Sequence, residues 1–558
     1  MTKFSQIKYV RPQKEDVLKS LDEFKARFDA AQTLDEFLQV HADYKVFSEH
    51  ISTAMQVAFI RFTLDTRDEF YAAENDYMDE VSPALSVKFA ELNKCYLASP
   101  FRTELEKIFP PVMFVNMQMQ VDAASPLIVD DAAIQNKLVT EYTKLMSGVT
   151  ADFNGETLPL SGLRKYFTDP DRNLRKGAYE AMGKILADNG DKLDEIYDKL
   201  VEVRTRMGRK LGYDNYSPLG YLRRQRNCYG KEDVAKFREN VKKYFVPLVC
   251  KIRAKVQKDL GWKKQYVYDD AVFTHSTPKP HGTVEEIFAA GSKMYHEMSA
   301  ETGKLFDLMV KSECFDVLSR EGKWGGGYCT GLPEYKLPFI LSNFNGSAGD
   351  VDVLTHEFGH AYEYYKSFDV DTEFLSSISM ETAEVHSMSM EFLTYPWMKL
   401  FFGDETDDYK FYHLGGAVCF LPYGVIVDYF QQICYDDPTL SPAQRNELWN
   451  RLENEYLPYM TTEGVVGVED GRRWQRQAHI FEEPFYYIDY CFAQFTALQF
   501  LALSQKDYAE TFANYVKFLT LGSTMPFTEL LAECGLKSPF DEQSFKDVVA
   551  SVEKLLAL

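Results

Sequence analysis

Residues 355–361 read Thr-His-Glu-Phe-Gly-His-Ala, inside a longer stretch that has the periodicity of a helix. His356 and His360 are four residues apart, so on a helix they lie on one face, one turn apart. This is the spacing that two imidazole nitrogens need to bind one metal ion. Glu357 follows the first histidine directly, where a general base for a metal-activated water belongs. The stretch therefore predicts a helix that carries a zinc site.

A catalytic zinc ion takes three protein ligands and keeps one position open for water. The downstream segment 379–391 supplies the candidates for the third ligand, which are Glu381, Glu384, His386 and Glu391. Glu381 and Glu384 are three residues apart and share a helical face, so one can bind the metal while the other supports it. Spacing alone does not choose between the two glutamates.

Upstream of the motif the sequence loses its helical periodicity. Residues 323–331 are dense in glycine, and residues 337–346 are typical of a strand that ends in a turn. Asp350 lies close to the N-cap position of the motif helix. A free edge of the strand at 337–346 would pair with an extended peptide through main-chain hydrogen bonds beside the metal. The alternative is an internal strand that is paired on both sides.

Most of the remaining chain has the pattern of amphipathic helices, beginning with residues 14–98. A short strand is predicted at 112–119, directly after a Pro-Pro break. The turn-forming residues Asn189-Gly190-Asp191 predict a boundary between an N-terminal helical domain, 1–190, and a catalytic domain, 191–558.

The composition narrows the classes of function and the partners. The 558 residues carry a formal net charge of −22, which repels nucleic acid. The 9 cysteines are scattered without a C-x-x-C pair, which favours a reducing compartment. Neither a hydrophobic N-terminal leader nor a run of about 18 apolar residues is found. We therefore expect a soluble, cytoplasmic protein with no membrane or nucleic-acid partner.

The motif and the segment downstream of it resemble the thimet oligopeptidase and oligoendopeptidase F family of zinc metallopeptidases. The sequence H-E-F-G-H is followed, 23 residues later, by E-x-x-S-M-x-M-E, which begins at Glu384. The resemblance continues through Gly326–Thr330, Pro338–Ile340 and Leu211–Tyr216, and covers roughly 190–558. The helical N-terminal part is similar to the oligoendopeptidase F branch. In this family the glutamate that opens the second motif is the third zinc ligand, so the resemblance implies Glu384.

The segment Arg476–Tyr490 resembles the part of the family that turns a histidine and tyrosines toward the substrate. The matching residues are His479, Tyr486 and Tyr490, and a neutral phenol or imidazole is a suitable donor to an oxyanion. The spacing differs from that of the thimet branch, and the glycines of that branch are missing. Which of these residues, or Tyr487, contacts the oxyanion therefore stays open, and an aromatic face packed in the core is the alternative.

The resemblance implies a mainly α fold, with two helical lobes around a deep channel and a small β-sheet beside the zinc helix. Residues 1–190 would form a wall or lid of the channel, which would admit short unfolded peptides. We expect one Zn²⁺ per chain and a zinc-dependent oligoendopeptidase that hydrolyses internal bonds of short peptides. The alternatives are a carboxypeptidase or dipeptidase of similar helical fold, and a non-catalytic peptide-binding protein that retains zinc. Cleavage preference and oligomeric state are not determined by the sequence.

Overall fold

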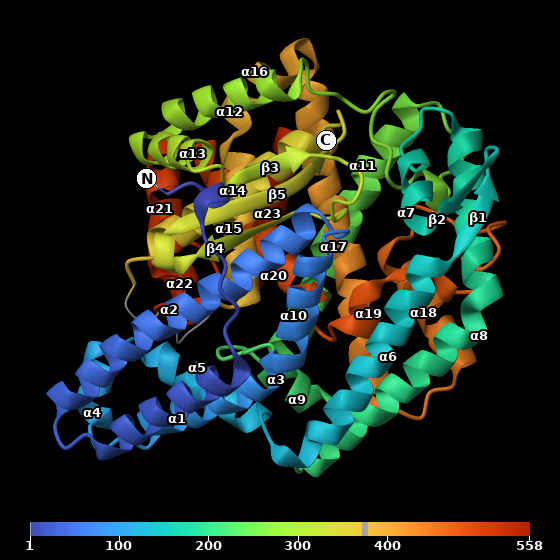
Figure 1. Ribbon diagram of the computed structural model, residues 1–558. Coiled ribbons are helices and arrows are strands. Elements are labelled where there is room, and N and C mark those ends of the chain that lie inside the picture. The colour runs from blue at the N-terminus through green and yellow to red at the C-terminus, as the bar shows by residue number, and fades with distance from the viewer. Residues whose placement is uncertain (1, 371–377) are drawn as a thin grey trace. The chain divides into compact units, whose positions relative to one another are not determined.

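A computed structural model describes residues 2–370 and 378–558 and is mainly helical, as predicted (Figure 1). The chain forms two compact units, each assembled from three separate segments. The first unit consists of residues 1–124, 279–406 and 503–536, and the second of 125–278, 407–502 and 537–558. The chain thus passes between the units at five places, after residues 124, 278, 406, 502 and 536.

The N-terminal segment of the first unit has a hydrophobic core of its own, formed around Phe28, Phe37, Tyr96 and Met113. The helices of this segment are α1 (Lys14–Ala30), α2 (Leu34–Leu64), α3 (Glu69–Leu97), α4 (Arg102–Ile108) and α5 (Pro111–Ala123). The other helices of the first unit are α12 (Val284–Met298), α13 (Ala300–Lys311), α14 (Gly349–Ser367), α15 (Met380–Leu393), α16 (Lys399–Phe402), α21 (Tyr508–Leu521) and α22 (Phe527–Glu533).

The strand predicted at 112–119 is wrong, because these residues belong to helix α5. Pro111 occupies the first turn of the helix, where its missing N–H costs nothing. Met113, Phe114 and Met117 are buried at helical spacing. The β-branched and aromatic residues of the segment favour a strand. The segment is a helix because the face that carries Met113, Phe114 and Met117 packs into the N-terminal core.

A three-stranded sheet in the first unit lies beside the motif helix. It consists of β3 (Phe315–Leu318), β4 (Tyr328–Leu332) and β5 (Leu337–Phe344), in the order β3-β5-β4 (Figure 1). β5 pairs in parallel with β3 and antiparallel with β4. The predicted strand therefore exists, but it is internal, and among the described residues the edge strands of this sheet are β3 and β4 instead. The almost continuous burial of β5 is typical of a strand paired and covered on both sides.

The two faces of β4 are covered by different helices of the first unit. Thr330 donates a hydrogen bond of 2.9 Å to Gln56 of α2. On the other face, a Cβ added to Gly331 would lie 2.8 Å from the ring of Tyr364 in α14. The sheet is thus positioned between the N-terminal helix α2 and the motif helix α14.

The connection from β5 to α14 is held by Asp350. Its buried carboxylate accepts backbone hydrogen bonds from Asn345 and Gly346, the latter at 2.7 Å. Gly346 has a φ of 81°, a conformation that favours glycine. Asp350 lies in the first turn of α14, near the predicted position, and fixes the direction in which the motif helix leaves the sheet.

The second unit contains the longest helix, α8 (Arg172–Lys210), which continues without a break through the predicted domain boundary at 190. Asn189, Gly190 and Asp191 are helical because the face of α8 that includes Gly190 packs against later parts of the same unit, and a Cβ at Gly190 would lie 2.1 Å from Arg472. Domains 1–190 and 191–558 therefore do not coincide with the compact units.

The other elements of the second unit are helical apart from one β-hairpin, whose strands are β1 (Thr150–Phe153) and β2 (Glu156–Pro159). Its other helices are α6 (Val129–Gly148), α7 (Leu160–Leu163), α9 (Ser217–Arg223), α10 (Lys231–Asn240), α11 (Val246–Asp259), α17 (Thr406–Asp436), α18 (Pro442–Tyr456), α19 (Ala478–Glu482), α20 (Tyr487–Ser504) and α23 (Glu542–Leu555). The stretch Lys399–Asp436, mostly α17, is apolar and long enough to span a membrane, but 72% of its apolar window is buried in the protein.

Candidate active site

Three predicted metal ligands come together in the first unit. Nε2 of His356 lies 3.5 Å from Oε2 of Glu384, and Nε2 of His360 lies 3.7 Å from the same oxygen. The ligand atoms of the three residues all lie within 4.8 Å of one another. The two imidazoles keep 25% and 19% of their surface exposed, so a metal ion and a substrate can reach them.

This donor set fits a zinc ion. Zinc binds imidazole nitrogen and carboxylate oxygen at about 2.1 Å, so tetrahedral ligand atoms lie about 3.4 Å apart. The observed separations of 3.5 and 3.7 Å from Glu384 are close to this value. Two histidines and one carboxylate also leave a fourth position open. Glu381 is buried but is not part of a metal-binding group in the described residues.

The glycine between the two histidines allows the helices that carry the ligands to touch. A Cβ on Gly359 would lie 2.5 Å from the carbonyl oxygen of His386 and 2.6 Å from the Cα of Ser387. No side chain fits there, and α14 and α15 therefore meet backbone to backbone. This contact brings Glu384 to the histidines of α14.

Two side chains of α15 orient the ligands. Glu391 pairs with Nδ1 of His356 at 2.6 Å, which places a proton on Nδ1 and turns Nε2 toward Glu384. The hydroxyl of Ser387 donates to Oε2 of Glu384 at 3.1 Å. Carboxylates that hold a ligand histidine in this way fix its tautomer and raise its basicity.

The charges of the cluster suit a cation. Burial lowers the pKa of His360 to about 4, so this imidazole is neutral and can bind a metal. Burial also lowers the pKa of His356, but its hydrogen bonds with Glu384 and Glu391 outweigh that effect and hold the pKa well above the usual value. Burial raises the pKa of Glu384, but His356 and His360 outweigh it and keep the carboxylate ionised.

Glu357 is buried beside this cluster, and burial is the main reason that its pKa is raised to about 7. The charge of His356 lowers this pKa, and the neighbouring carboxylates raise it. The glycine-dense segment passes close by, because a Cβ on Gly327 would lie 3.8 Å from Oε1 of Glu357. A carboxyl group with a pKa near neutrality is suited to accept a proton and release it again.

The predicted C-terminal residues form an aromatic cluster in the second unit. His479 lies on α19, Tyr487 and Tyr490 lie on α20, and Tyr486 directly precedes α20. The ring of His479 lies 5.7 Å from that of Tyr486, 5.0 Å from Tyr487 and 6.2 Å from Tyr490, between centroids. All four side chains are partly exposed. The structure thus groups the predicted residues but does not single out one tyrosine.

The tautomer of His479 follows from its neighbours. Tyr423 donates to Oε1 of Gln477 at 2.9 Å, which leaves the amide nitrogen of Gln477 to donate to Nδ1 of His479, also at 2.9 Å. Burial lowers the pKa of His479. The imidazole is therefore neutral and carries its proton on Nε2, where it can act as a hydrogen-bond donor.

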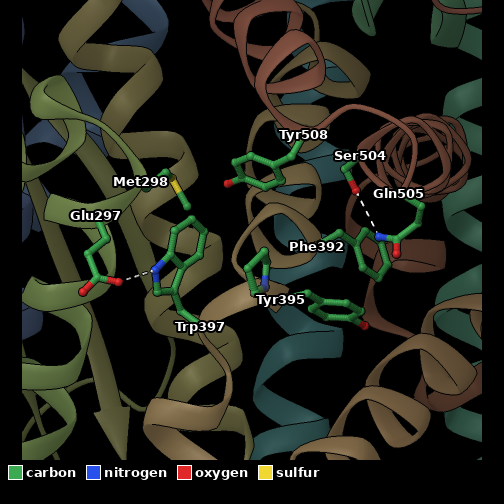
Figure 2. Close-up of a pocket in the computed structure, with 9 residues that line it drawn as sticks. Glu297, Met298, Phe392, Tyr395, Trp397, Ser504, Gln505 and Tyr508 are labelled. Atoms are coloured by element: carbon green, nitrogen blue, oxygen red, sulfur yellow. Dashed lines mark hydrogen bonds between the residues drawn. The ribbon is translucent and has the colours of Figure 1, made fainter.

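A separate cavity of about 560 Å³ lies in the first unit and is lined by aromatic side chains that include Tyr395, Trp397 and Tyr508 (Figure 2). Its carboxylate, Glu297, accepts a hydrogen bond of 2.9 Å from the indole of Trp397. No histidine or cysteine is among the described residues that line it. The cavity therefore does not contain a donor set like that of His356, His360 and Glu384.

Two family models match this chain. The model of the peptidase M3 N-terminal domain matches residues 4–124, and that of peptidase family M3 matches residues 166–548. The chain belongs to peptidase family M3. The resemblance inferred from the motifs is confirmed, and this M3 protein is a metallopeptidase enzyme.

Solved structures and a curated relative support the same family. PZ peptidase A, in a structure with inhibitor 2, is 41% identical to this M3 peptidase with a TM-score of 0.93, and the match covers 100% of this chain and 99% of the other. A Bacillus anthracis str. Ames structure assigned as an oligoendopeptidase F is 38% identical, with a TM-score of 0.88 and the same coverage. Oligopeptidase PepF of Bacillus subtilis (strain 168) is 20% identical, over 97% of this chain and 84% of PepF.

Two neighbours of the M3 site have contacts that the sequence patterns did not predict. Glu391 was a candidate ligand, but it contacts Nδ1 of His356 instead. The signal was present, since Glu391 lies seven residues after Glu384 and so on the same helical face. Gln477 gave no such signal, because its role depends on Tyr423, which is 54 residues away in the sequence.

Proposed function

We propose that the protein is a zinc-dependent oligoendopeptidase that hydrolyses internal peptide bonds of short, unfolded peptides. The observation that supports this most strongly is the meeting of His356, His360 and Glu384 beside the buried carboxyl of Glu357, in a chain of family M3. His356, His360 and Glu384 would hold one zinc ion per chain. Bound zinc supplies a Lewis acid that polarises the scissile carbonyl and lowers the pKa of the attacking water.

Glu357 is the general base in this proposal. Its carboxylate accepts the proton of the attacking water, and the protonated carboxyl then gives that proton to the leaving amine. The environment favours both steps, because burial brings the pKa to about 7 and so makes both protonation states accessible at neutral pH. Glu391 keeps His356 in the tautomer that presents Nε2.

We assign the oxyanion donors to the aromatic cluster of the second unit, on the strength of the family resemblance. His479 is a neutral donor through Nε2. The phenols of Tyr486 and Tyr490 are donors that need no change of protonation at neutral pH. Aligned donors of this kind stabilise the tetrahedral intermediate more than the planar substrate.

We propose that the peptide backbone pairs with the outer edge of β4. In the described part of the chain β4 has one strand partner, β5. An extended peptide that adds to this edge receives main-chain hydrogen bonds that do not depend on its sequence. Gly327 directly precedes β4 and lies next to Glu357, which supports a substrate edge close to the proposed base.

We also propose that the enzyme works in the cytoplasm. Eight of the nine cysteines, all except Cys228, are free thiols, and six of these are buried. Burial raises the pKa of the Cys95 thiol to about 11, so it is a poor thiolate nucleophile at neutral pH. A protein with this many unpaired thiols is suited to a reducing compartment.

The test combines metal analysis with product mapping. Purified protein is assayed on a mixture of peptides blocked at both termini and on the same peptides with free termini, with and without a chelator. We expect about one zinc per chain, cleavage at internal bonds and loss of cleavage when zinc is removed. Release of residues only from unblocked C-termini would instead identify a carboxypeptidase or dipeptidase. Zinc and peptide binding without any cleavage would identify a non-catalytic binding protein.

A further inference from the structure

Three aromatic side chains form an exposed group in the first unit, close to the candidate active site. They are Phe59 on α2, Trp324 in the glycine-dense segment and Tyr328 at the start of β4. Ring centroids of Phe59 and Tyr328 lie 5.1 Å apart, and those of Trp324 and Tyr328 lie 6.0 Å apart. Phe59 is 38% exposed and Trp324 is 42% exposed. Adjacent large aromatic side chains that stay exposed are a feature of ligand-binding surfaces.

Hydrogen bonds hold Tyr328 and the backbone around Trp324 in fixed positions. The hydroxyl of Tyr328 hydrogen-bonds with that of Thr63 at 2.6 Å, and the backbone N–H of Trp324 donates to the carbonyl of Thr63 at 2.9 Å. The side-chain amide of Asn343 donates to the carbonyls of Trp324 and Gly326, both at 2.8 Å. These bonds hold the Tyr328 side chain and the backbone of Trp324 in place before any ligand arrives, which reduces the entropy lost on binding.

Gly326 and Gly327 leave room for side chains that pack against the backbone of this segment. A Cβ on Gly326 would lie 2.0 Å from the indole of Trp324, so the ring rests on the bare backbone. A Cβ on Gly327 would approach Oε1 of Glu357 to 3.8 Å. Tyr328 directly follows Gly327 in the sequence. The aromatic group is therefore one residue away from the position that contacts the proposed general base.

The group lies on the face of β4 that is turned toward α2. Tyr328 and Thr330 point to this face, as their bonds to Thr63 and Gln56 show. The side chains of an extended peptide paired with the edge of β4 alternate between the two faces in the same way. A peptide residue that points away from α14 therefore points toward Phe59 and Tyr328.

We propose that Phe59, Trp324 and Tyr328 form a subsite for one aromatic side chain of the peptide substrate. The inference rests on the proposed function and adds a substrate preference to it. Aromatic rings pack in tilted and edge-to-face arrangements, and the exposed faces of Phe59 and Trp324 offer such contacts to a third ring. The main-chain pairing accepts any sequence, whereas this subsite distinguishes phenylalanine from alanine at one position.

The test compares pairs of blocked peptides that differ only by Phe or Ala at one position, moved stepwise along the chain of the substrate. In the wild-type enzyme we expect one position at which Phe raises kcat/KM by at least about tenfold over Ala. In Phe59→Ala and in Trp324→Ala the ratio of kcat/KM between the Phe peptide and the Ala peptide should fall to about one. Phe70→Ala removes an exposed ring of α3 outside the group and should leave the preference intact.

A binding measurement separates this inference from the proposed function. The same peptide pairs are titrated into zinc-loaded Glu357→Gln, alone and combined with Phe59→Ala. We expect the Phe peptide to bind about tenfold more tightly than the Ala peptide, and the difference to vanish in the double variant. Equal affinity of Glu357→Gln for both peptides would overturn the subsite. An equal loss of affinity for both peptides in the double variant would overturn it as well. Failure of the wild-type enzyme to cleave any peptide overturns the proposed function, and the titration still decides on the subsite.

Discussion

At the scale of single residues, the proposed chemistry depends on the carboxyl group of Glu357. Its pKa is raised to about 7, mainly by burial, which suits a base that must accept and release one proton in each turnover. We expect Glu357→Gln to bind zinc as the wild type does and to lose turnover by about a hundredfold to ten-thousandfold. Metal content and single-turnover hydrolysis measured on the same sample check this. Substantial activity in this variant would remove Glu357 as the base.

If His356 is a zinc ligand as proposed, its protonation makes zinc binding dependent on pH. Its pKa is held well above the usual value by Glu384 and Glu391, so the metal-free imidazole is protonated at neutral pH. Zinc binds the neutral form, so binding releases a proton and affinity rises as pH rises. We expect release of about one proton or more per zinc at pH 7. Calorimetry in two buffers of different ionisation enthalpy measures this number, and a value near zero would contradict the charge state assigned to His356.

The carboxylate of Glu391 is expected to strengthen metal binding without touching the metal. It holds Nδ1 of His356 at 2.6 Å. Partners of ligand histidines are worth about tenfold to a hundredfold in metal affinity, so we expect Glu391→Gln to weaken zinc binding by that amount. Glu297→Gln changes a carboxylate that accepts from Trp397 in the separate cavity and is the matched control. Competition with a chelator of known affinity measures both variants, and equal affinities would contradict the role of Glu391.

These residues differ in how far the sequence could predict them. His356, Glu357 and His360 belong to one helix, and helical spacing alone places them together. Glu384 lies on another helix, so the choice over Glu381 needed the family resemblance. The contact of Glu391 with His356 depends on how α14 and α15 cross, which no local pattern specifies.

At the scale of elements, the site depends on the backbone contact between α14 and α15. A Cβ on Gly359 would lie 2.5 Å from a carbonyl oxygen of α15, and backbone atoms cannot move away as a flexible side chain would. We expect Gly359→Ala to separate the helices, to lower the free energy of unfolding by about 1–3 kcal/mol and to weaken zinc binding. Chemical denaturation and zinc titration measure the two effects.

The control for this substitution is another helical glycine. Gly416 lies in α17 and has no atoms within 4 Å of an added Cβ. Gly416→Ala should leave zinc binding unchanged and raise stability by about 0.4–1 kcal/mol, because alanine favours the helix. If Gly359→Ala behaved like Gly416→Ala, the close crossing of α14 and α15 would not determine the metal site.

Local sequence patterns predicted where the helices and strands lie better than they predicted which other elements these pair with or pack against. The strand at 337–346 was found from its apolar run, and β5 occupies Leu337–Phe344. Its internal place in the sheet depends on β3 and β4, which are short and carry weak local signals. For α5 the local pattern misled, since its β-branched and aromatic residues suit a strand while packing against α3 requires a helix.

At the scale of the whole molecule, the path of the chain explains why the boundary predicted at residue 190 does not coincide with a boundary between compact units. Gly and Asn at a turn-forming position predicted a boundary at 190, yet α8 continues through this point because later segments pack against it. Each compact unit combines three segments that are distant in sequence. Such an arrangement is a property of tertiary packing, and composition along the chain does not reveal it.

The hydrophobic cores predict which fragments fold alone. The core around Phe28, Phe37 and Tyr96 draws all its buried residues from the range 17–117, so fragment 1–124 contains a complete core. Fragment 191–558 begins in the middle of α8 and lacks 1–124, which is part of the first unit. We expect 1–124 to be helical by circular dichroism and to unfold cooperatively in urea, and 191–558 to unfold without cooperativity and to aggregate. Cooperative unfolding of 191–558 with zinc bound would show that the segments before residue 191 are not needed for its core.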